Sequence, residues 1–365
     1  MCGVLGPPPR WSTKSGSFRP GLPEVPVASA TRWVGGWLRV RALLRRVGSR
    51  PVGWGWRSGR PVAALAVVVA LLLTLHPLIP NTLLHLGSLL EAFLPWLALA
   101  VPVFVLLALV RRSFLALVAL LLPVLAWFGA FGGLLRPADG GPYDLTAVQH
   151  NVSDVNADPT TTARALAAVK PDLIGAEEVT PEALPAYQAA LGAQYPYHTV
   201  QGTVGLWSRY PLAEERLLDI KPSGLAAEWN RGLRAVARTP HGDVAVYVAH
   251  LPSVRLGPTV GFNTARRDDS AAKLGAAIMA EPLRRVILIG DLNSTVDDRG
   301  LHPVTSQLSW APRGLALSWP AALPVARIDQ IMVRAATVTK VWTLPKTGSD
   351  HLPIAARIRF QEATE

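Results

Sequence analysis

Three long apolar stretches dominate the first 136 residues of the chain. They run from about Val62 to Ile79, from Leu86 to Val110 and from Phe114 to Leu135. A helix needs about 20 mainly apolar residues to cross the hydrocarbon core of a bilayer, and each stretch is of roughly that length. The pattern therefore predicts three transmembrane helices between residues 61 and 136.

Beyond residue 142 the pattern changes to short apolar runs that alternate with amphipathic segments. The expected strands are Leu145–Val152, Leu173–Ala176, Val244–His250, Val286–Gly290 and Ile328–Val333, and the expected helices are Thr160–Val169 and Thr264–Met279. Strands that alternate with helices are typical of an α/β domain. We expect this domain over residues 143–365, joined to the apolar region by a polar, glycine-rich linker at 137–142.

The positive charge of the chain is confined to its N-terminal part. Residues 1–140 contain 14 Lys and Arg against 3 Asp and Glu, a balance of +11, whereas residues 141–365 contain 22 of each kind. Eleven of the basic residues precede the first apolar stretch, and Arg111 and Arg112 separate the second from the third. Because basic loops stay on the cytoplasmic side of a membrane, residues 1–60 are predicted to be cytoplasmic and the α/β domain extracytoplasmic.

Two further observations concern the ends of the chain. Residues 32–47 place Trp and aliphatic residues at helical spacing between arginines. This pattern fits a basic helix lying on the inner leaflet, and equally a solvated tail whose charge only sets the orientation. The neutral balance of the C-terminal domain gives no electrostatic argument for binding nucleic acid, whose affinity depends mainly on phosphate contacts. The one cysteine, Cys2, excludes an intrachain disulfide.

Polar residues suited to catalysis or metal binding stand where the predicted strands end. They are Asn151, Glu177 with Glu178, His250, Asp291 with Asn293, Asp329, and Asp350 with His351. In open α/β sheets, ligands bind at strand ends. Taken alone, an Asn or Asp there is more often a turn or cap residue, and a lone His is more often a satisfied, half-buried side chain. The occurrence of six such positions in one domain weakens these structural explanations together.

In their order along the chain, these residues resemble the motifs of the endonuclease/exonuclease/phosphatase superfamily, which includes DNase I-like nucleases, sphingomyelinases and inositol-polyphosphate phosphatases. The matching positions are Asn151, Glu177-Glu178, His250, Gly290-Asp291-Leu292-Asn293, Ile328-Asp329 and Ser349-Asp350-His351, and residues 205–211 look like the family's Ser-Arg-x-Pro strand. The resemblance covers about residues 143–360. It implies a DNase I-like four-layer α/β sandwich that hydrolyses phosphoric esters with a divalent metal ion.

The resemblance also implies a role for each residue. Glu178 is expected to hold the metal, with Asn151 and Asp350 as near or water-mediated ligands, and Mg²⁺ is favoured over Mn²⁺ because such hard cations prefer oxygen ligands. The expected catalytic residues are Asp291 to orient or deprotonate water, Asn293 to hold a phosphate oxygen, His351 paired with Asp329, and His250 to protonate the leaving oxygen or contact the phosphate.

Two positions depart from the family pattern. Glu177 stands where the family usually has Gln, which adds a negative charge beside the metal ligand. The usual Arg-x-x-Gln on the helix after the His is blurred into Arg266-Arg267-Asp268-Asp269. We expect the first departure to bear on substrate preference, and the second leaves the equivalent residue unassigned.

A catalytic domain held at the outer surface of a membrane meets lipid phosphates, envelope phosphate polymers and stray nucleic acid. Our first hypothesis is a lipid-linked or cell-envelope phosphate ester or pyrophosphate, with the bilayer as the other partner and no protein partner evident. The architecture is similar to actinobacterial membrane proteins of the teicoplanin-resistance (VanJ-like) type, which would imply a role in antibiotic resistance. An extracellular nuclease and a catalytically silent phosphate-binding sensor or scaffold are the alternatives.

Overall fold

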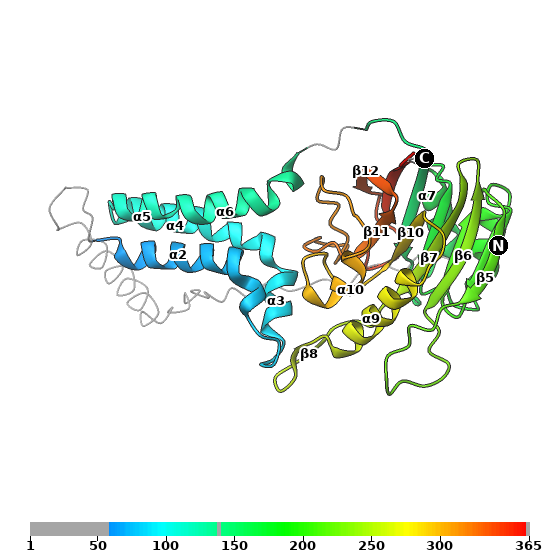
Figure 1. Ribbon diagram of the computed structural model, residues 1–365, viewed down its shortest axis with the longest axis horizontal. Coiled ribbons are helices and arrows are strands. Elements are labelled where there is room, and N and C mark those ends of the chain that lie inside the picture. Colours follow the sequence, from blue (N-terminus) through cyan, green and yellow to red (C-terminus); the bar gives the residue numbers. More distant parts are fainter. Residues whose placement is uncertain (1–57, 137–139, 363–365) are drawn as a thin grey trace, which may run out of the picture. The chain divides into compact units, whose positions relative to one another are not determined.

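The computed structural model describes residues 58–136 and 140–362 of the chain (Figure 1). The predicted cytoplasmic region lies outside these residues apart from its last three positions, as does the segment 32–47. The first three residues of the predicted linker also lie outside them. All the described residues belong to one compact unit that runs from Trp54 to Glu365.

The apolar region forms a series of helices. Their bounds are α2 (Arg60–Leu75), η2 (His76–Leu78), α3 (Leu86–Ala92), η3 (Leu94–Leu99), α4 (Ala100–Val110), α5 (Phe114–Ala119), α6 (Leu121–Phe131) and η4 (Gly132–Leu135). Two continuous segments, Arg60–Leu78 and Phe114–Leu135, are long and apolar enough to cross a membrane. They coincide with the first and third predicted spans.

The second predicted span is not one continuous helix. Leu86–Ala92 and Leu94–Val110 meet at an angle of 71°, so the described residues contain three spans only if this bent pair counts as one. The bend falls at Phe93, two residues before Pro95, and proline cannot donate the backbone hydrogen bond that a helix interior needs. Hydropathy alone cannot locate such a bend, because apolar residues continue on both sides of it.

The C-terminal domain contains two main sheets and a small hairpin. The six-stranded sheet has the order β12-β13-β1-β2-β4-β3, the five-stranded sheet has the order β11-β10-β7-β6-β5, and β8 pairs with β9. The strand bounds are β1 (Leu145–Asn151), β2 (Leu173–Glu177), β3 (Tyr197–Gln201), β4 (Val204–Ser208), β5 (Leu212–Leu217), β6 (Gly232–Thr239), β7 (Gly242–His250), β8 (Arg255–Gly257), β9 (Gly261–Asn263), β10 (Val286–Asp291), β11 (Asp329–Arg334), β12 (Ala336–Thr343) and β13 (Ile354–Phe360).

The two large sheets pack face to face, and helices cover their outer faces (Figure 1). α7 (Pro159–Ala167) and α8 (Leu184–Leu191) pack on the six-stranded sheet, and α9 (Ala265–Met279) and α10 (His302–Thr305) pack on the five-stranded sheet, with η5 (Arg299–Leu301) before α10. Strands between two such layers are buried on both faces, which explains why β1 and β10 are buried at every position. The predicted α/β sandwich is confirmed.

Candidate active site

The register of the strands brings the predicted site residues together. Asp291, the last residue of β10, lies opposite His250 of β7 on one side and Asp329 of β11 on the other. In the other sheet Asn151 lies opposite Glu177. β10 and β7 approach so closely at Gly290 that a Cβ there would collide with the carbonyl oxygen of Ala249. A glycine before Asp291 is therefore a requirement of this packing.

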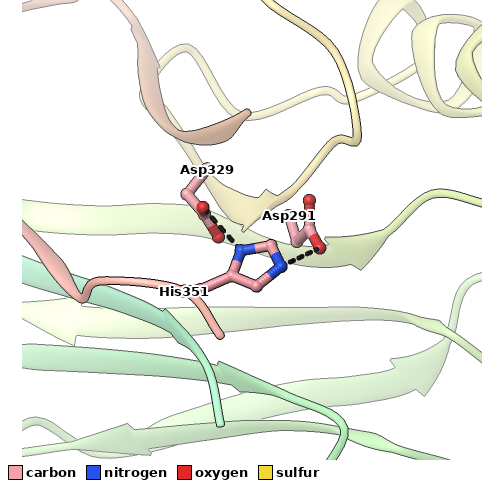
Figure 2. Close-up of side chains that lie close together, drawn as sticks. All are labelled: Asp291, Asp329 and His351. Atoms are coloured by element: carbon pink, nitrogen blue, oxygen red, sulfur yellow. Dashed lines mark hydrogen bonds and ion pairs between the residues drawn. The ribbon is translucent and has the colours of Figure 1, made fainter. Parts of the chain in front are cut away.

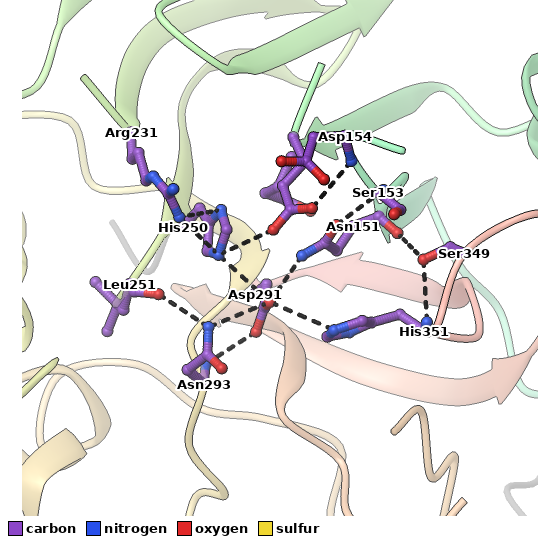
Figure 3. Close-up of polar contacts among 12 residues, drawn as sticks. Asn151, Ser153, Asp154, Arg231, His250, Leu251, Asp291, Asn293, Ser349 and His351 are labelled. Atoms are coloured by element: carbon purple, nitrogen blue, oxygen red, sulfur yellow. Dashed lines mark hydrogen bonds and ion pairs between the residues drawn. The ribbon is translucent and has the colours of Figure 1, made fainter. Parts of the chain in front are cut away.

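These strand ends open into a cleft of about 1100 Å³. Seven of the eight residues predicted to form the site line it, namely Asn151, Glu178, His250, Asp291, Asn293, Asp350 and His351. The eighth, Asp329, is fully buried and contacts the imidazole of His351. Figure 3 shows how Asn151, His250, Asn293 and His351 surround Asp291. The fold thus gathers side chains that are up to 200 residues apart in sequence.

His351 lies between two carboxylates (Figure 2). Its Nδ1 is 2.8 Å from Oδ2 of Asp329, and its Nε2 is 3.8 Å from Oδ2 of Asp291. Gln149 Nε2 donates to the other oxygen of Asp329 at 2.8 Å, which fixes that carboxylate. Burial opposes the charge on His351, but the two carboxylates outweigh it and raise the pKa of His351 to about 10. The side chain is therefore an imidazolium at neutral pH.

Asp291 is the hub of the cluster. Its Oδ1 accepts from the backbone N–H of Asn293 at 2.9 Å, and its Oδ2 accepts from Nδ2 of Asn151 at 3.1 Å. Burial and the charge of Asp329 raise the pKa of Asp291 to about 7, and His351 and Asn151 moderate the shift. A carboxyl with a pKa near neutrality can both accept and release a proton at physiological pH.

His250 is also buried, and Arg231 lies against it. Arg231 Nη1 is 3.2 Å from Nδ1 and 3.3 Å from Nε2 of the imidazole, while Nε2 is 3.6 Å from Oδ2 of Asp291. Burial, and then the positive charges of Arg231 and His351, hold the pKa of His250 well below its usual range. A neutral imidazole suits contact with a phosphate oxygen better than donation of a proton to a leaving group.

Sequence reasoning missed Arg231. It directly precedes β6, and its carbonyl accepts the backbone N–H of His250 at 2.9 Å. The signal was its place in Trp229-Asn-Arg-Gly232, just before a strand that pairs with the strand of His250. Arg267 was likewise left unassigned. It is buried, lines the cleft, and pairs with Asp298 at 2.7 Å.

Glu178 lines the cleft and is partly exposed. Its side chain is 26% exposed, compared with 1% for Asp291. Its Oε2 accepts from the backbone N–H of Asp154 at 3.1 Å. Glu178, Ser153 and Asn293 all line the cleft and all have positive φ angles, of 62°, 65° and 47°. Left-handed backbone at non-glycine residues is costly and concentrates at functional sites.

Glu177 points away from the cleft into the core. It is fully buried, and its Oε2 accepts from Nε2 of Gln149 at 2.8 Å. Burial, together with Asp329 and Asp291, raises the pKa of Glu177 well above its usual range. Burial and the neighbouring carboxylates thus disfavour a charge on Glu177, and its side chain contacts Gln149 in the core and does not line the cleft beside Glu178.

The loop that carries Asp350 and His351 is pinned to the first strand. Ser349 Oγ donates to the carbonyl of Asn151 at 2.7 Å and accepts from the backbone N–H of His351 at 3.0 Å. Asp350 itself is exposed and lines the cleft. The serine of the Ser-Asp-His motif thus holds the imidazole in place.

Two groups of side chains could hold a cation here. Among the described residues, Asp291, Asp329 and His351 offer ligand atoms within 4.8 Å of one another. However, Nδ1 of His351 and Oδ2 of Asp329 are already hydrogen-bonded to each other, so neither atom is open to a cation. The predicted ligands Glu178, Asn151 and Asp350 line the same cleft with oxygen donors, and this donor chemistry fits a hard divalent cation.

Comparison with known proteins gives a family match. Residues 133–351, more than half of the chain, match the endonuclease/exonuclease/phosphatase family. No curated protein matches the sequence.

Several solved structures resemble this one at low identity. An endonuclease/exonuclease/phosphatase from Beutenbergia cavernae has 18% identity and a TM-score of 0.49, over 61% of this chain and 73% of that one. The beta toxin of Staphylococcus aureus has 17% identity and a TM-score of 0.47, over 60% and 100%. Sphingomyelinase C of Streptomyces griseocarneus has 19% identity and a TM-score of 0.44, over 60% and 99%.

Proposed function

We propose that this chain, which belongs to the endonuclease/exonuclease/phosphatase family of metal-dependent phosphoester hydrolases, is a membrane-anchored, extracytoplasmic phosphoesterase. The observation that carries the proposal is the convergence of His250, Asp291 and His351 on one cleft, with Asp329 behind His351. This set can orient water, stabilise phosphoryl charge and contact a phosphate.

The metal is proposed to be Mg²⁺, with Mn²⁺ as the other candidate, held by Glu178 with Asn151 and Asp350. Glu178 supports this because it is partly exposed and can reach a hydrated cation. When bound, the cation supplies Lewis-acid stabilisation of charge on the phosphoryl oxygens. The remaining chemistry belongs to the side chains of the cleft.

The proposed reaction is hydrolysis by a water molecule that Asp291 orients. The water oxygen forms a bond to phosphorus, the ester P–O bond breaks, and the proton that the water loses balances the one that the leaving oxygen gains. Asn293 and neutral His250 would contact the phosphate oxygens. The imidazolium of His351, held by Asp329, would stabilise the negative charge that develops on them.

The proposed topology places the α/β domain outside the cytoplasm. Asp298 and Arg299 of this domain contact the beginning of the second apolar stretch, through Ser88 and Glu91 of α3. Arg111, in the basic turn between the second and third stretches, lies near the N-terminal end of the first helix, where its carbonyl accepts a hydrogen bond from Ser58. The α/β domain thus contacts the ends of the helices that are far from the basic turn. This arrangement agrees with the rule that basic loops stay on the cytoplasmic side.

The proposed substrate is a phosphate ester or pyrophosphate that is lipid-linked or part of the cell envelope. A domain in contact with helix ends faces the membrane surface, where such substrates are concentrated. Assignment to the VanJ-like type, with its implied role in antibiotic resistance, rests on architecture and stays a prediction.

The test is phosphate release by the full chain in nanodiscs, with Mg²⁺ or with EDTA. The panel contains a polyprenyl pyrophosphate, a soluble phosphomonoester, a sphingomyelin-type diester and DNA. His351→Ala is the control that should be inactive. His302→Ala, which makes the same substitution at an exposed histidine, is the matched control that should stay active. We expect Mg²⁺-dependent turnover of a lipid substrate that only His351→Ala abolishes. Turnover of DNA alone would favour the nuclease, and no turnover by folded protein would favour a phosphate-binding sensor.

A further inference from the structure

The catalytic cleft has an apolar wall that comes from the membrane region. Leu89, Ala92 and Phe93, at the end of α3, line the same cleft as Asp291 and His351. Leu89 and Phe93 are each 37% exposed, as is Trp319 of the α/β domain, which also lines the cleft. Hydrolysis of a phosphate group alone does not require this wall, because phosphate contacts are polar.

A second cavity of about 240 Å³ continues from this wall. It shares Ala92, Thr295 and Ala326 with the catalytic cleft. Beyond them it is lined mostly by apolar side chains of both regions, such as Leu99 and Leu315, with Asp297 and Arg327 among the exceptions. We call it the apolar cavity. The two spaces adjoin at these shared residues, with acidic and imidazole groups lining the first and mostly hydrocarbon side chains lining the second.

Polar contacts fix the two walls of these spaces against each other. Arg299 donates to Glu91 through Nε at 2.8 Å and Nη2 at 2.7 Å, and its backbone N–H donates to the same carboxylate at 3.0 Å. Glu91 is 2% exposed. Gly87 allows this approach, because a Cβ there would lie 2.8 Å from Cζ of Arg299. Trp96 Nε1 donates to the carbonyl of Val325 at 2.7 Å, beside the apolar cavity.

We propose that the apolar cavity binds the hydrocarbon chain of an amphiphilic phosphoester whose phosphate lies at Asp291 and His351. This inference rests on the proposed function and adds to it a site for the tail, built from α3, η3 and the loop that contains Leu315. An amphiphile fits because its polar and apolar ends are joined in the same order as the two spaces. The membrane helices then form part of the substrate site in addition to anchoring the domain.

The proposal predicts a dependence on chain length. The full chain in nanodiscs is given p-nitrophenyl alkyl phosphates with methyl, butyl and hexyl chains, all soluble as monomers. Burial of a methylene group is worth about fourfold in affinity. We therefore expect kcat/KM to rise steeply from the methyl to the hexyl ester. Partition of the longer esters into the bilayer also raises their rate of hydrolysis in every variant. The comparison of variants with the wild type therefore distinguishes binding in the apolar cavity from partition.

Two substitutions obstruct these spaces from different sides. Ala92→Trp fills the junction between the two spaces, and Leu315→Asp places a charge in the apolar cavity at a residue that is 45% exposed. We expect each to reduce the hexyl-to-methyl ratio of kcat/KM by about tenfold or more. Leu106→Ser, at a residue that is 61% exposed and lines neither space, is expected to keep the wild-type ratio.

The outcomes separate this inference from the proposed function. Hydrolysis of the methyl ester with an unchanged ratio in both folded variants would overturn the tail site and leave the phosphoesterase intact. Absence of Mg²⁺-dependent hydrolysis of every ester by the wild type would overturn the phosphoesterase itself, and the tail site with it. A reduced ratio in only the two obstructing variants would support both.

Discussion

At the scale of single residues, the site depends on how one imidazole shares its surroundings with two carboxylates. Asp329 is fully buried, yet its hydrogen bond and charge interaction with His351 outweigh burial and keep the pKa of Asp329 below its usual range. Burial and Asp329 raise the pKa of Asp291 instead. Two acids that lie opposite each other on adjacent strands therefore differ in pKa because their neighbours differ.

Asp329→Asn tests the effect of the buried carboxylate on His351. The substitution keeps the shape and removes the charge, so we expect turnover to fall by about 10²–10⁴-fold. The pKa of His351, raised to about 10 by Asp329 and Asp291, should fall, and the imidazolium should be lost at lower pH. The alkaline limb of the pH–rate profile should therefore move to lower pH. A slower enzyme whose alkaline limb does not move would contradict the role given to the imidazolium.

The sequence could predict which residues form the site but not their protonation. Asn151, His250 and Asp291 are recognisable because they follow apolar strands in a fixed order. Glu177 looked like an added charge beside the metal ligand, whereas it is buried and hydrogen-bonded to Gln149, and burial raises its pKa well above the usual range. That outcome depends on where each of two adjacent glutamate side chains points. Glu177 ends the strand, and the backbone turns to a positive φ angle at Glu178, so the two side chains point to different places.

At the scale of elements, an ion pair links β6 to the end of α9. Arg234 donates to Glu281 through Nε and Nη2, both at 3.0 Å, and Tyr247 donates to Glu281 at 2.7 Å. Both charged side chains are at most 1% exposed. Removal of Glu281 leaves the buried Arg234 with the exposed Glu214, at 2.7 Å, as its remaining carboxylate partner, and breaking a buried ion pair typically costs about 3–5 kcal/mol. The pair therefore stabilises the packing of the five-stranded sheet on its helix.

Glu281→Ala should lower the free energy of unfolding by about 3–5 kcal/mol. Burial opposes the charge of Glu281, but bonds from Arg234 and Tyr247 outweigh it and lower its pKa. The stabilisation is thus complete above the unfolded pKa of about 4.3 and is lost as the pH falls through the folded pKa. Denaturant unfolding at pH 7 and at pH 4 measures it. Glu215→Ala, at an exposed residue of β5, should cost little; an equal loss in both variants would refute the account.

The elements that the sequence predicted are those with uninterrupted apolar runs. β7 and β10 are buried at nearly every position. Their apolar sequences therefore predict strands even when the neighbouring strands are not known. β5 and β8 lie at the edge of the fold, are largely exposed and carry charged residues, and no periodicity marked them. The bend within the predicted span over 86–110 could not be predicted for a related reason, because hydropathy records the apolar length and not the angle of 71° between Leu86–Ala92 and Leu94–Val110.

At the scale of the whole molecule, Glu91 and Arg299 couple the apolar helices to the α/β domain. Their contact joins residues 208 positions apart, with both carboxylate oxygens of Glu91 engaged by Arg299. Glu91 lies within the second predicted span, and the sequence gives no sign of its partner. Arg299 of η5 acquires this role only when the α/β domain is folded against the helices.

A double-mutant cycle measures this coupling. Arg299→Met leaves the buried Glu91 with only the imidazole of His76, at 2.9 Å, as a partner. Glu91→Leu removes the carboxylate from Arg299. Each should lower the free energy of unfolding, by up to about 3–5 kcal/mol. The double variant should lose much less than the sum of the two, because neither charge is left unpaired. Unfolding of the full chain in the same detergent gives the three values. Strict additivity would show that the two residues do not interact.

The central claim is that the cleft hydrolyses phosphoesters with a cation held at Glu178. The most direct test is the rate of hydrolysis of a soluble phosphodiester by the full chain across a titration of Mg²⁺ in metal-free buffer. It is run on the wild type, on Glu178→Ala and on Glu182→Ala, which changes an exposed glutamate four residues away. We predict that turnover by the wild type depends on Mg²⁺ and that Glu182→Ala retains this turnover. Loss of a side chain that only supports a metal ligand costs up to about 100-fold, so loss of the proposed ligand in Glu178→Ala should lower turnover by about 100-fold or more. An unchanged Mg²⁺ titration curve in folded Glu178→Ala would contradict the account.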